Sequence, residues 1–84
     1  MDKYIVAQIH PFVLEQEINT YVDGECVQTI KCTLDNMCER IYMLCQKYDI
    51  FNVHFYGGQL YALKFKDEFA ACKYGNRPIE IHIH

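Results

Sequence analysis

The 84-residue sequence contains no tryptophan, only two prolines and only four glycines. So few turn-forming residues, together with long periodic segments, argue against a small disulfide-stapled scaffold. The sequence also lacks any run of the roughly 18 to 20 apolar residues that a membrane span requires. No basic segment followed by an apolar run and a small-residue cleavage site opens the chain, so no secretory signal is expected. We therefore expect a cytoplasmic protein without a membrane segment.

Basic residues are also scarce. Eight Lys and Arg stand against eleven Asp and Glu, which gives a formal net charge of -3. The chain thus lacks the overall positive field of a simple nucleic-acid binder, and we do not expect nucleic acid as a partner. Hydrophobic residues make up 51% of the chain, which is ample for a packed core and argues against disorder.

Cysteine is the one residue type that is unusually frequent. The odd count, the absence of a signal and the core-like positions predict reduced thiols that pack as small hydrophobic side chains. Cys26 and Cys32 share strand parity, so their side chains are expected on one face of a strand. The five cysteines are Cys26, Cys32, Cys38, Cys45 and Cys72.

Alternating residues predict a three-stranded antiparallel meander at the start of the chain. The strands are expected at 3–10, 12–22 and 25–33, with a turn near Pro11 and a hairpin at Asp23-Gly24. The second strand would place four apolar side chains on one face, with two polar exceptions. The apolar four are Phe12, Leu14, Ile18 and Val22, and the exceptions are Gln16 and Thr20.

A period of three to four residues follows. It predicts a helix over 34–48 with Thr33 as its N-cap, and then a strand over 51–56. Gly57-Gly58 could close a hairpin or lead into a helix over 59–74, and we favour the helix. Its buried face would carry Tyr61, Ala62, Phe65, Phe69 and Cys72. A last strand is expected over 78–84.

These elements predict one α/β domain over residues 1–84, with a mixed sheet and the order β-β-β-α-β-α-β. Over nearly the whole chain, this order resembles the core of the ribonuclease H-like fold without its usual last helix. Nucleases of that fold hold metal ions with carboxylates on the first and fourth strands. Here both strands lack an acid, and the nearest ones are Glu15, Glu17 and Asp49. The absence of these carboxylates argues against an enzyme.

The histidines allow an alternative prediction, which is a metal-binding site. His82 and His84 stand two apart on a strand and should share a face, and His54 on the neighbouring strand could join them. We favour a solvated polar face over a metal site and predict no cofactor. The alternative is a nucleic-acid-processing or metal-binding module in which His10 and these three histidines replace carboxylates. At Gly57-Gly58 we favour a tight turn over an anion-binding loop.

Apolar side chains beyond the expected core stripes indicate a protein interface. The candidates on the second helix and last strand are Leu60, Leu63, Ala70, Tyr74, Ile79, Ile81 and Ile83. Either element could also mediate self-association. In size, acidity and lack of a catalytic set, the chain resembles accessory and host-interaction proteins of phages and mobile elements. That resemblance implies a non-catalytic factor that binds a host or defence protein.

Overall fold

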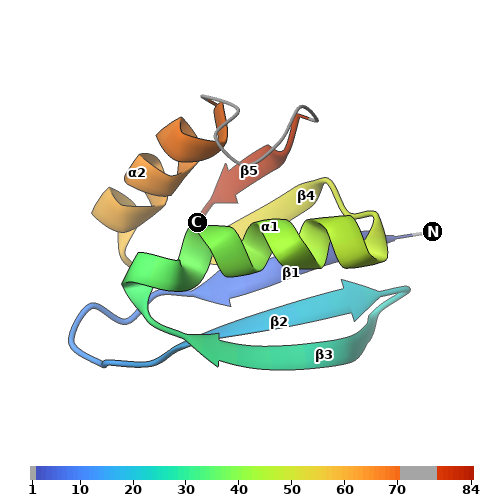
Figure 1. The fold of residues 1–84 in the computed structure, drawn as a ribbon, viewed down its shortest axis with the longest axis horizontal. Coiled ribbons are helices and arrows are strands. Elements are labelled where there is room, and N and C mark those ends of the chain that lie inside the picture. The colour runs from blue at the N-terminus through green and yellow to red at the C-terminus, as the bar shows by residue number, and fades with distance from the viewer. Residues whose placement is uncertain (1, 71–77) are drawn as a thin grey trace.

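The computed structural model describes residues 2–70 and 78–84, and its elements follow the predicted order (Figure 1). Strands β1, β2 and β3 are followed by a short 3-10 turn and helix α1, and then by β4, α2 and β5. Their bounds are β1 Lys3–Gln8, β2 Gln16–Val22, β3 Glu25–Cys32, η1 Leu34–Asn36, α1 Met37–Tyr48, β4 Asn52–Tyr56, α2 Gln59–Ala70 and β5 Glu80–Ile83.

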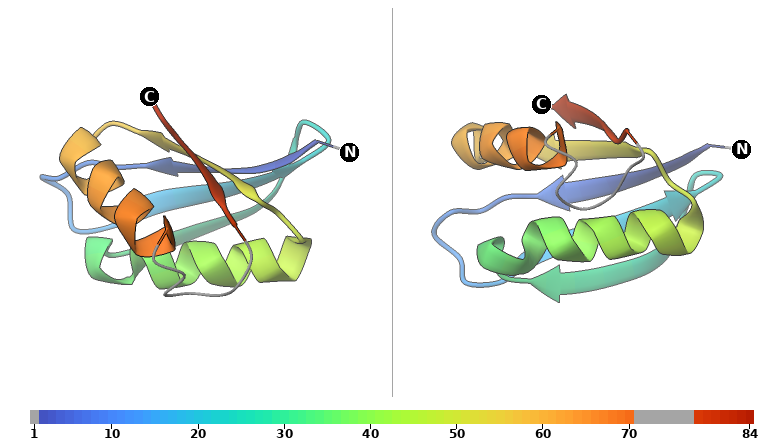
Figure 2. Two further views of the ribbon diagram at one scale, coloured as in Figure 1. Left: turned by 90° about the horizontal axis from the view of Figure 1, so that it is seen from above. Right: turned by 45° about the horizontal axis from the view of Figure 1, so that its top comes forward.

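The strands form one mixed sheet in the order β3-β2-β1-β4-β5. Strand β2 runs antiparallel to both of its neighbours, whereas β4 runs parallel to β1 and to β5. Both helices lie on the same face of this sheet and leave the opposite face without a helix in the described part of the chain (Figure 2). The α/β class, the meander and the two strand-helix units are confirmed.

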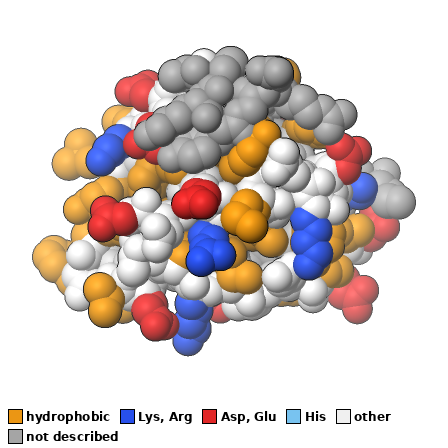
Figure 3. All heavy atoms as spheres, viewed as in Figure 1, with side chains coloured by type: hydrophobic (Ala, Val, Ile, Leu, Met, Phe, Trp, Pro, Cys, Tyr) orange, Lys and Arg blue, Asp and Glu red, His pale blue; other side chains and the backbone are white. Residues whose placement is uncertain are grey.

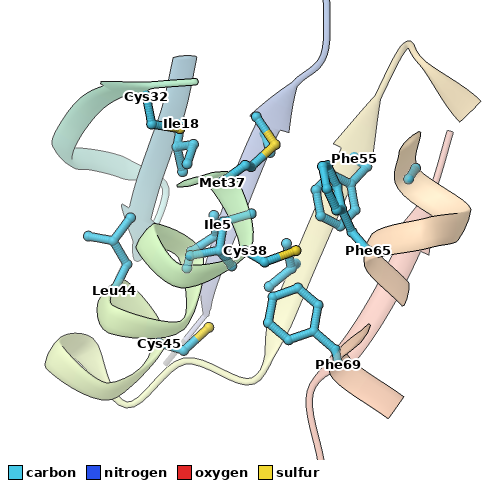
Figure 4. Packing of buried hydrophobic residues seen from close by; sticks show 14 of the residues in the cluster. Ile5, Ile18, Cys32, Met37, Cys38, Leu44, Cys45, Phe55, Phe65 and Phe69 are labelled. Carbon is cyan, nitrogen blue, oxygen red and sulfur yellow. The ribbon is translucent and has the colours of Figure 1, made fainter. Parts of the chain in front are cut away.

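The core lies between the helices and the helix-bearing face of the sheet. Phe55 of β4 packs its ring 5.7 Å from the ring of Phe65, and Met37 and Cys38 of α1 lie in the same cluster (Figure 4). Strands contribute alternate residues to it, as the period of two predicts. The buried members are Ile5, Ala7, Ile9, Ile18, Cys32, Met37, Cys38, Ile41, Leu44, Cys45, Ile50, Val53, Phe55, Ala62, Phe65 and Phe69.

The predicted start of the second strand is wrong. Strand β2 begins at Gln16, and the residues before it form a turn and loop. Phe12 and Leu14, expected on the apolar face of this strand, are 102% and 81% exposed, while Gln16 is fully buried. The alternation of apolar residues continued through a turn, so it did not mark the end of the strand. The Asp23-Gly24 hairpin is as predicted, because both residues have the positive φ angles that a type I′ turn requires.

A β-bulge overturns the predicted shared face of two cysteines. Tyr21 pairs with Cys26 and Thr20 pairs with Gln28, so Val27 is an extra residue without an opposite partner. One extra residue reverses the alternation of side chains. Cys32 consequently lies buried on the helix side, whereas Cys26 is exposed and lies beside Asn19 on the other face.

The helices differ from their predicted bounds mainly at the ends. Thr33 precedes the 3-10 turn instead of the α-helix and makes no side-chain cap bond. The end of α1 at Tyr48 is as predicted, and Asp49 after it has a left-handed φ of 57°. Tyr61, expected on the buried face of α2, is 38% exposed. Helix α2 is described to Ala70, so the predictions for Cys72 and Tyr74 lie outside the described residues. No helix in the described ranges is both long and apolar enough to cross a membrane.

Candidate functional site

The loop between β1 and β2 is held by one buried side chain. Val13 N–H donates to the His10 carbonyl at 3.0 Å, which closes a turn with Pro11 at its second position. The Gln16 side-chain amide accepts from His10 N–H at 2.6 Å, and donates to the His10 and Val13 carbonyls at 2.9 and 2.7 Å. Gln16 therefore satisfies the backbone of the loop that it follows.

The same loop begins with Ile9, which lies against the residues that precede α2. Ile9 N–H donates to the Tyr56 carbonyl at 2.9 Å, just after β1 ends. A side chain at Gly57 would place its Cβ 2.7 Å from the Ile9 carbonyl oxygen, and one at Gly58 would overlap the Ile9 side chain. Both glycines have positive φ. The glycine pair leads into a helix, as favoured from the sequence, and it permits this close approach of backbone and side chain.

The loop and the first turns of α2 together expose apolar side chains at one end of the molecule, shown at the left in Figure 3. Phe12, Leu14 and Leu60 are 102%, 81% and 83% exposed. A hollow of about 450 Å³ lies beside the loop and is lined by Phe12, Leu14, Leu34 and Tyr61, among others. We call this region the apolar end patch; it consists of Phe12, Val13, Leu14, Leu60, Tyr61 and Leu63.

The interface candidates from the sequence fall in different places. Leu60 and Leu63 are exposed in the apolar end patch, whereas Ala70 lies exposed at the opposite end of α2. The three isoleucines of the last strand pack in part against the core. Tyr74 lies outside the described residues. Phe12 and Leu14 were not among the interface candidates predicted from the sequence, although Pro11 at the second position of a turn was a signal that strand pairing stops there. The isoleucines are Ile79, Ile81 and Ile83.

Histidines gather on the sheet face that carries no helix. His54 of β4 is opposite His82 of β5 in the parallel register, and His84 follows directly after β5. The His54 ring stacks on that of His82 with a centroid distance of 4.5 Å, and it lies edge to edge with the His84 ring at a centroid distance of 5.2 Å. Tyr56 stacks on His84 at 4.4 Å, and the edge of Tyr4 meets His54 at 5.7 Å. We call His54, His82 and His84 the histidine cluster.

Stacking turns the face of His54 toward His82 and the face of Tyr56 toward His84, with interplanar angles of 14° and 9°. The His54 and His84 rings instead meet edge to edge through their nitrogens, with an interplanar angle of 20°. Ring faces occupied in this way are not free to stack on nucleobases, which is the usual role of aromatic rings on an open sheet that binds single strands.

The hydrogen bonds of the cluster divide its members. His54 Nδ1 and His84 Nε2 lie 2.9 Å apart and share one hydrogen bond. His82 Nε2 instead faces Asn52 Oδ1 at 3.3 Å and Glu80 Oε1 at 3.7 Å. The pKa of His54 is lowered from its ordinary value, first by burial and then by the nearby His82 and His84, against an opposing effect of Glu80. Neutral His54 is thus favoured near pH 7.

Within residues 2–70 and 78–84, no three His, Cys, Asp or Glu side chains are grouped so that they could jointly hold a metal ion. His10, the fourth member of the predicted alternative set, lies in the β1–β2 loop, where its backbone bonds to Gln16. The structure therefore brings together His54, His82 and His84 on one face and leaves His10 apart from them.

The buried cysteines lie in an apolar environment. Burial raises the pKa of Cys45 to about 12, and it also raises the pKa of Cys32, against a smaller opposing effect of Arg40. A thiol with a raised pKa forms little thiolate near pH 7 and is a poor nucleophile. These positions are those of packed hydrophobic side chains.

Thiol labelling of the folded protein tests this distinction between cysteines. Cys26 is exposed, whereas Cys32, Cys38 and Cys45 are buried. We expect Cys26 to react with a disulfide reagent faster than Cys38 and Cys45 by roughly 100-fold or more, because thiolate formation and access are both restricted in the core. Peptide mapping by mass spectrometry after timed quenching gives the rates. Equal rates at Cys26 and Cys45 under native conditions would contradict the buried assignment.

Comparison with protein-family models, with curated proteins and with solved structures finds no match to this chain. The apolar end patch and the histidine cluster are two surface features of the described residues that bear on function.

Proposed function

We propose that the chain is a non-catalytic protein-binding module whose partner docks on the apolar end patch. The observation that carries this proposal is the full exposure of Phe12 on a loop whose backbone is fixed by buried Gln16. Isolated exposed apolar residues are ordinary on protein surfaces, but a contiguous group at a loop and helix end is typical of an interaction site.

The energetics support a specific contact. Full burial of one Phe or Leu side chain contributes about 1.5–3 kcal/mol, so burial of Phe12, Leu14 and Leu60 would dominate the affinity of an interface. The hydrogen bonds of Gln16 hold the loop in one conformation before binding. Less loop entropy is then lost on association.

The occupant that fits this surface is a protein with an apolar groove able to accept Phe12 and Leu14. The six residues of the patch are hydrophobic, as in an interface core, and charged Asp35 lines the hollow beside them, as in a polar rim. The finer role, an accessory factor of a phage or mobile element acting on a host or defence protein, rests on the sequence resemblance. A second copy of the chain is the competing occupant, and the experiment separates the two.

The test compares the wild-type chain with a Phe12→Ser/Leu14→Ser double variant. Each is immobilised and exposed to an extract of the organism that carries the gene, and retained proteins are quantified. Because Phe12 and Leu14 make no core contact, folding should be unaffected, while retention of the specific partner should fall at least about tenfold. Met43→Ser, at an exposed position of α1, is the matched control and should retain the partner.

Two results would contradict the proposal. Retention that is equal in the wild type and the double variant would show that the patch is not the docking site. Sedimentation that gives a wild-type dimer, dissociated by the double substitution, would assign the patch to self-association instead of to another protein.

A further inference from the structure

The outer edge of β3 is a surface that belongs to neither the apolar end patch nor the histidine cluster. Strand β3 stands at one end of the sheet order, and no described strand lies beyond it (Figure 1). Alternate residues of such a strand direct backbone N–H and C=O groups away from the sheet. After the bulge at Val27, residues 28–32 pair with β2 in unbroken antiparallel register. This stretch therefore offers a regular backbone edge on which one more strand can pair.

A groove of about 280 Å³ lies beside this edge, between β3 and α1. A strand added to β3 would direct every second side chain into the groove, because side chains alternate between the two faces of a sheet. The groove offers both hydrocarbon and charge to those side chains. Its apolar lining comes from Ile30, Met43 and Leu44, and its polar lining comes from Gln28, Arg40 and Lys47.

The two cations of the groove have no carboxylate partner within residues 2–70 and 78–84. Lys47 Nζ donates to Gln28 Oε1 at 3.2 Å, and Tyr48 OH donates to the same oxygen at 2.7 Å, so a neutral side chain holds the ammonium beside β3. Arg40 is exposed on the same stripe of α1. The chain as a whole carries a net charge of -3, so this edge is locally opposite in sign. A negatively charged partner complements it.

We propose that the edge of β3 binds an extended acidic segment of a partner protein as an additional strand. Its carboxylates would pair with Arg40 and Lys47, and an apolar side chain between them would enter the groove beside Ile30 and Met43. Helix α1 runs alongside β3 (Figure 2), so positions along the two elements correspond.

The spacing of the two cations defines the pattern of the segment. Arg40 and Lys47 are seven positions apart, which is about 10.5 Å along a helix. Two strand residues four positions apart are separated by about 13 Å and share a face with the residue midway between them. The long Arg and Lys side chains can span the difference. The segment that fits is therefore acid-x-apolar-x-acid.

A second copy of the chain fits this edge less well. Pairing of β3 with β3 of another copy about a two-fold axis would place the two α1 helices on one side of the joined sheet. Arg40 and Lys47 would then face the same cations of the other copy. The bulge at Val27 and the charge of Lys31 are also features by which edge strands resist self-pairing. The cations that repel a second copy attract an acidic strand.

Nuclear magnetic resonance titration of the isotope-labelled chain tests this site with the capped peptide Thr-Glu-Thr-Val-Thr-Glu-Thr. We expect saturable shifts at the amides of residues 28–32, with a dissociation constant below about 1 mM. Hydrogen exchange should slow at alternate residues of β3, because only the outward N–H groups gain a partner. Added salt should weaken the binding, and the same peptide with Lys in place of Glu should not bind.

Matched double variants assign the contribution of the cations. Arg40→Gln/Lys47→Gln should weaken peptide binding about fivefold or more. Lys64→Gln/Lys66→Gln removes the same charge from exposed positions of α2 and should leave the affinity within about twofold of wild type. No saturable binding, or equal losses in the two double variants, would overturn the site. Slower exchange of the same β3 amides at high protein concentration without peptide would assign the edge to a second copy instead.

The edge site does not rest on the apolar end patch. Phe12→Ser/Leu14→Ser should bind the peptide as tightly as wild type, whereas Met43→Ser removes hydrocarbon from the groove and should weaken peptide binding about threefold. A partner docked on the apolar end patch should respond to these two variants in the opposite way. Loss of binding at one surface therefore does not imply loss at the other.

Discussion

Replacing Gln16 with leucine is expected to lower the free energy of unfolding by about 2–3 kcal/mol, although the substitution adds an apolar side chain to a buried position. The Gln16 amide makes three hydrogen bonds to the backbone of the β1–β2 loop. Leucine can make none, so the His10 N–H and the Val13 carbonyl lose their partner. Unpaired backbone groups with restricted access to water are more costly than the lost bonds themselves.

Chemical denaturation with a matched control measures this effect. Gln8→Leu makes the same change at an exposed position of β1 and is expected to alter the stability by no more than about 0.5 kcal/mol. Gln16→Leu should also loosen the loop that presents Phe12, and hydrogen exchange at Val13 should become faster. A Gln16→Leu protein as stable as wild type would show that the amide contacts contribute no net stability.

The second large effect is expected at the glycine pair that leads into α2. Gly57→Ala would place a Cβ 2.7 Å from the Ile9 carbonyl oxygen, and Gly57 has a φ of +75°. The left-handed backbone alone costs about 1–2 kcal/mol for a residue with a side chain. The clash with backbone atoms adds about 1–3 kcal/mol, because neither β1 nor α2 can move away without disturbing the core between them.

Gly24→Ala separates these two contributions. Gly24 has a similar φ of +81°, but a Cβ there would meet nothing within 4 Å. We expect Gly24→Ala to lose only the backbone contribution of about 1–2 kcal/mol in thermal or denaturant unfolding. Equal losses for Gly24→Ala and Gly57→Ala would mean that the contact with Ile9 is not a constraint on the fold.

Local periodicity was sufficient to predict the class and order of the elements. Ile5 and Ala7, Val53 and Phe55, and the stripe of α1 that contains Ile41 are buried as a period of two or of 3.6 predicts. Gln16 and Thr20, the two polar residues on the predicted apolar face of the second strand, are also buried. Their alternate positions in the strand indicated the buried face correctly, although polar side chains are usually exposed.

Features that depend on contacts between distant segments were not predictable. The exposure of Phe12 follows from the amide bonds of Gln16, and the role of Gly57 follows from its contact with Ile9, 48 positions earlier in the chain. Cys26 lies on the opposite face from Cys32 because a single extra residue, Val27, enters the ladder. No local pattern of hydrophobicity marks a bulge of this kind.

For the histidines, the sequence was sufficient to place His82 and His84 on one face. Their approach to His54 required β4 and β5 to be neighbours in a fixed parallel register. The 2.9 Å contact with His84, and the different partners of His82, depend on ring orientations that spacing in the sequence does not determine. The cluster could thus be suspected from the sequence, but the contacts between its rings could not be predicted.

The alternation within β5 has one more consequence. Ile81 and Ile83 pack toward the helices, while His82 and His84 stack on the other face. A shift of this strand by a single residue would push imidazoles into hydrocarbon and lift isoleucines into water at the same time. The side chains of this short edge strand therefore fix its register. The histidines that form the histidine cluster also disfavour pairing shifted by one residue, so they help β5 to pair correctly when the sheet assembles.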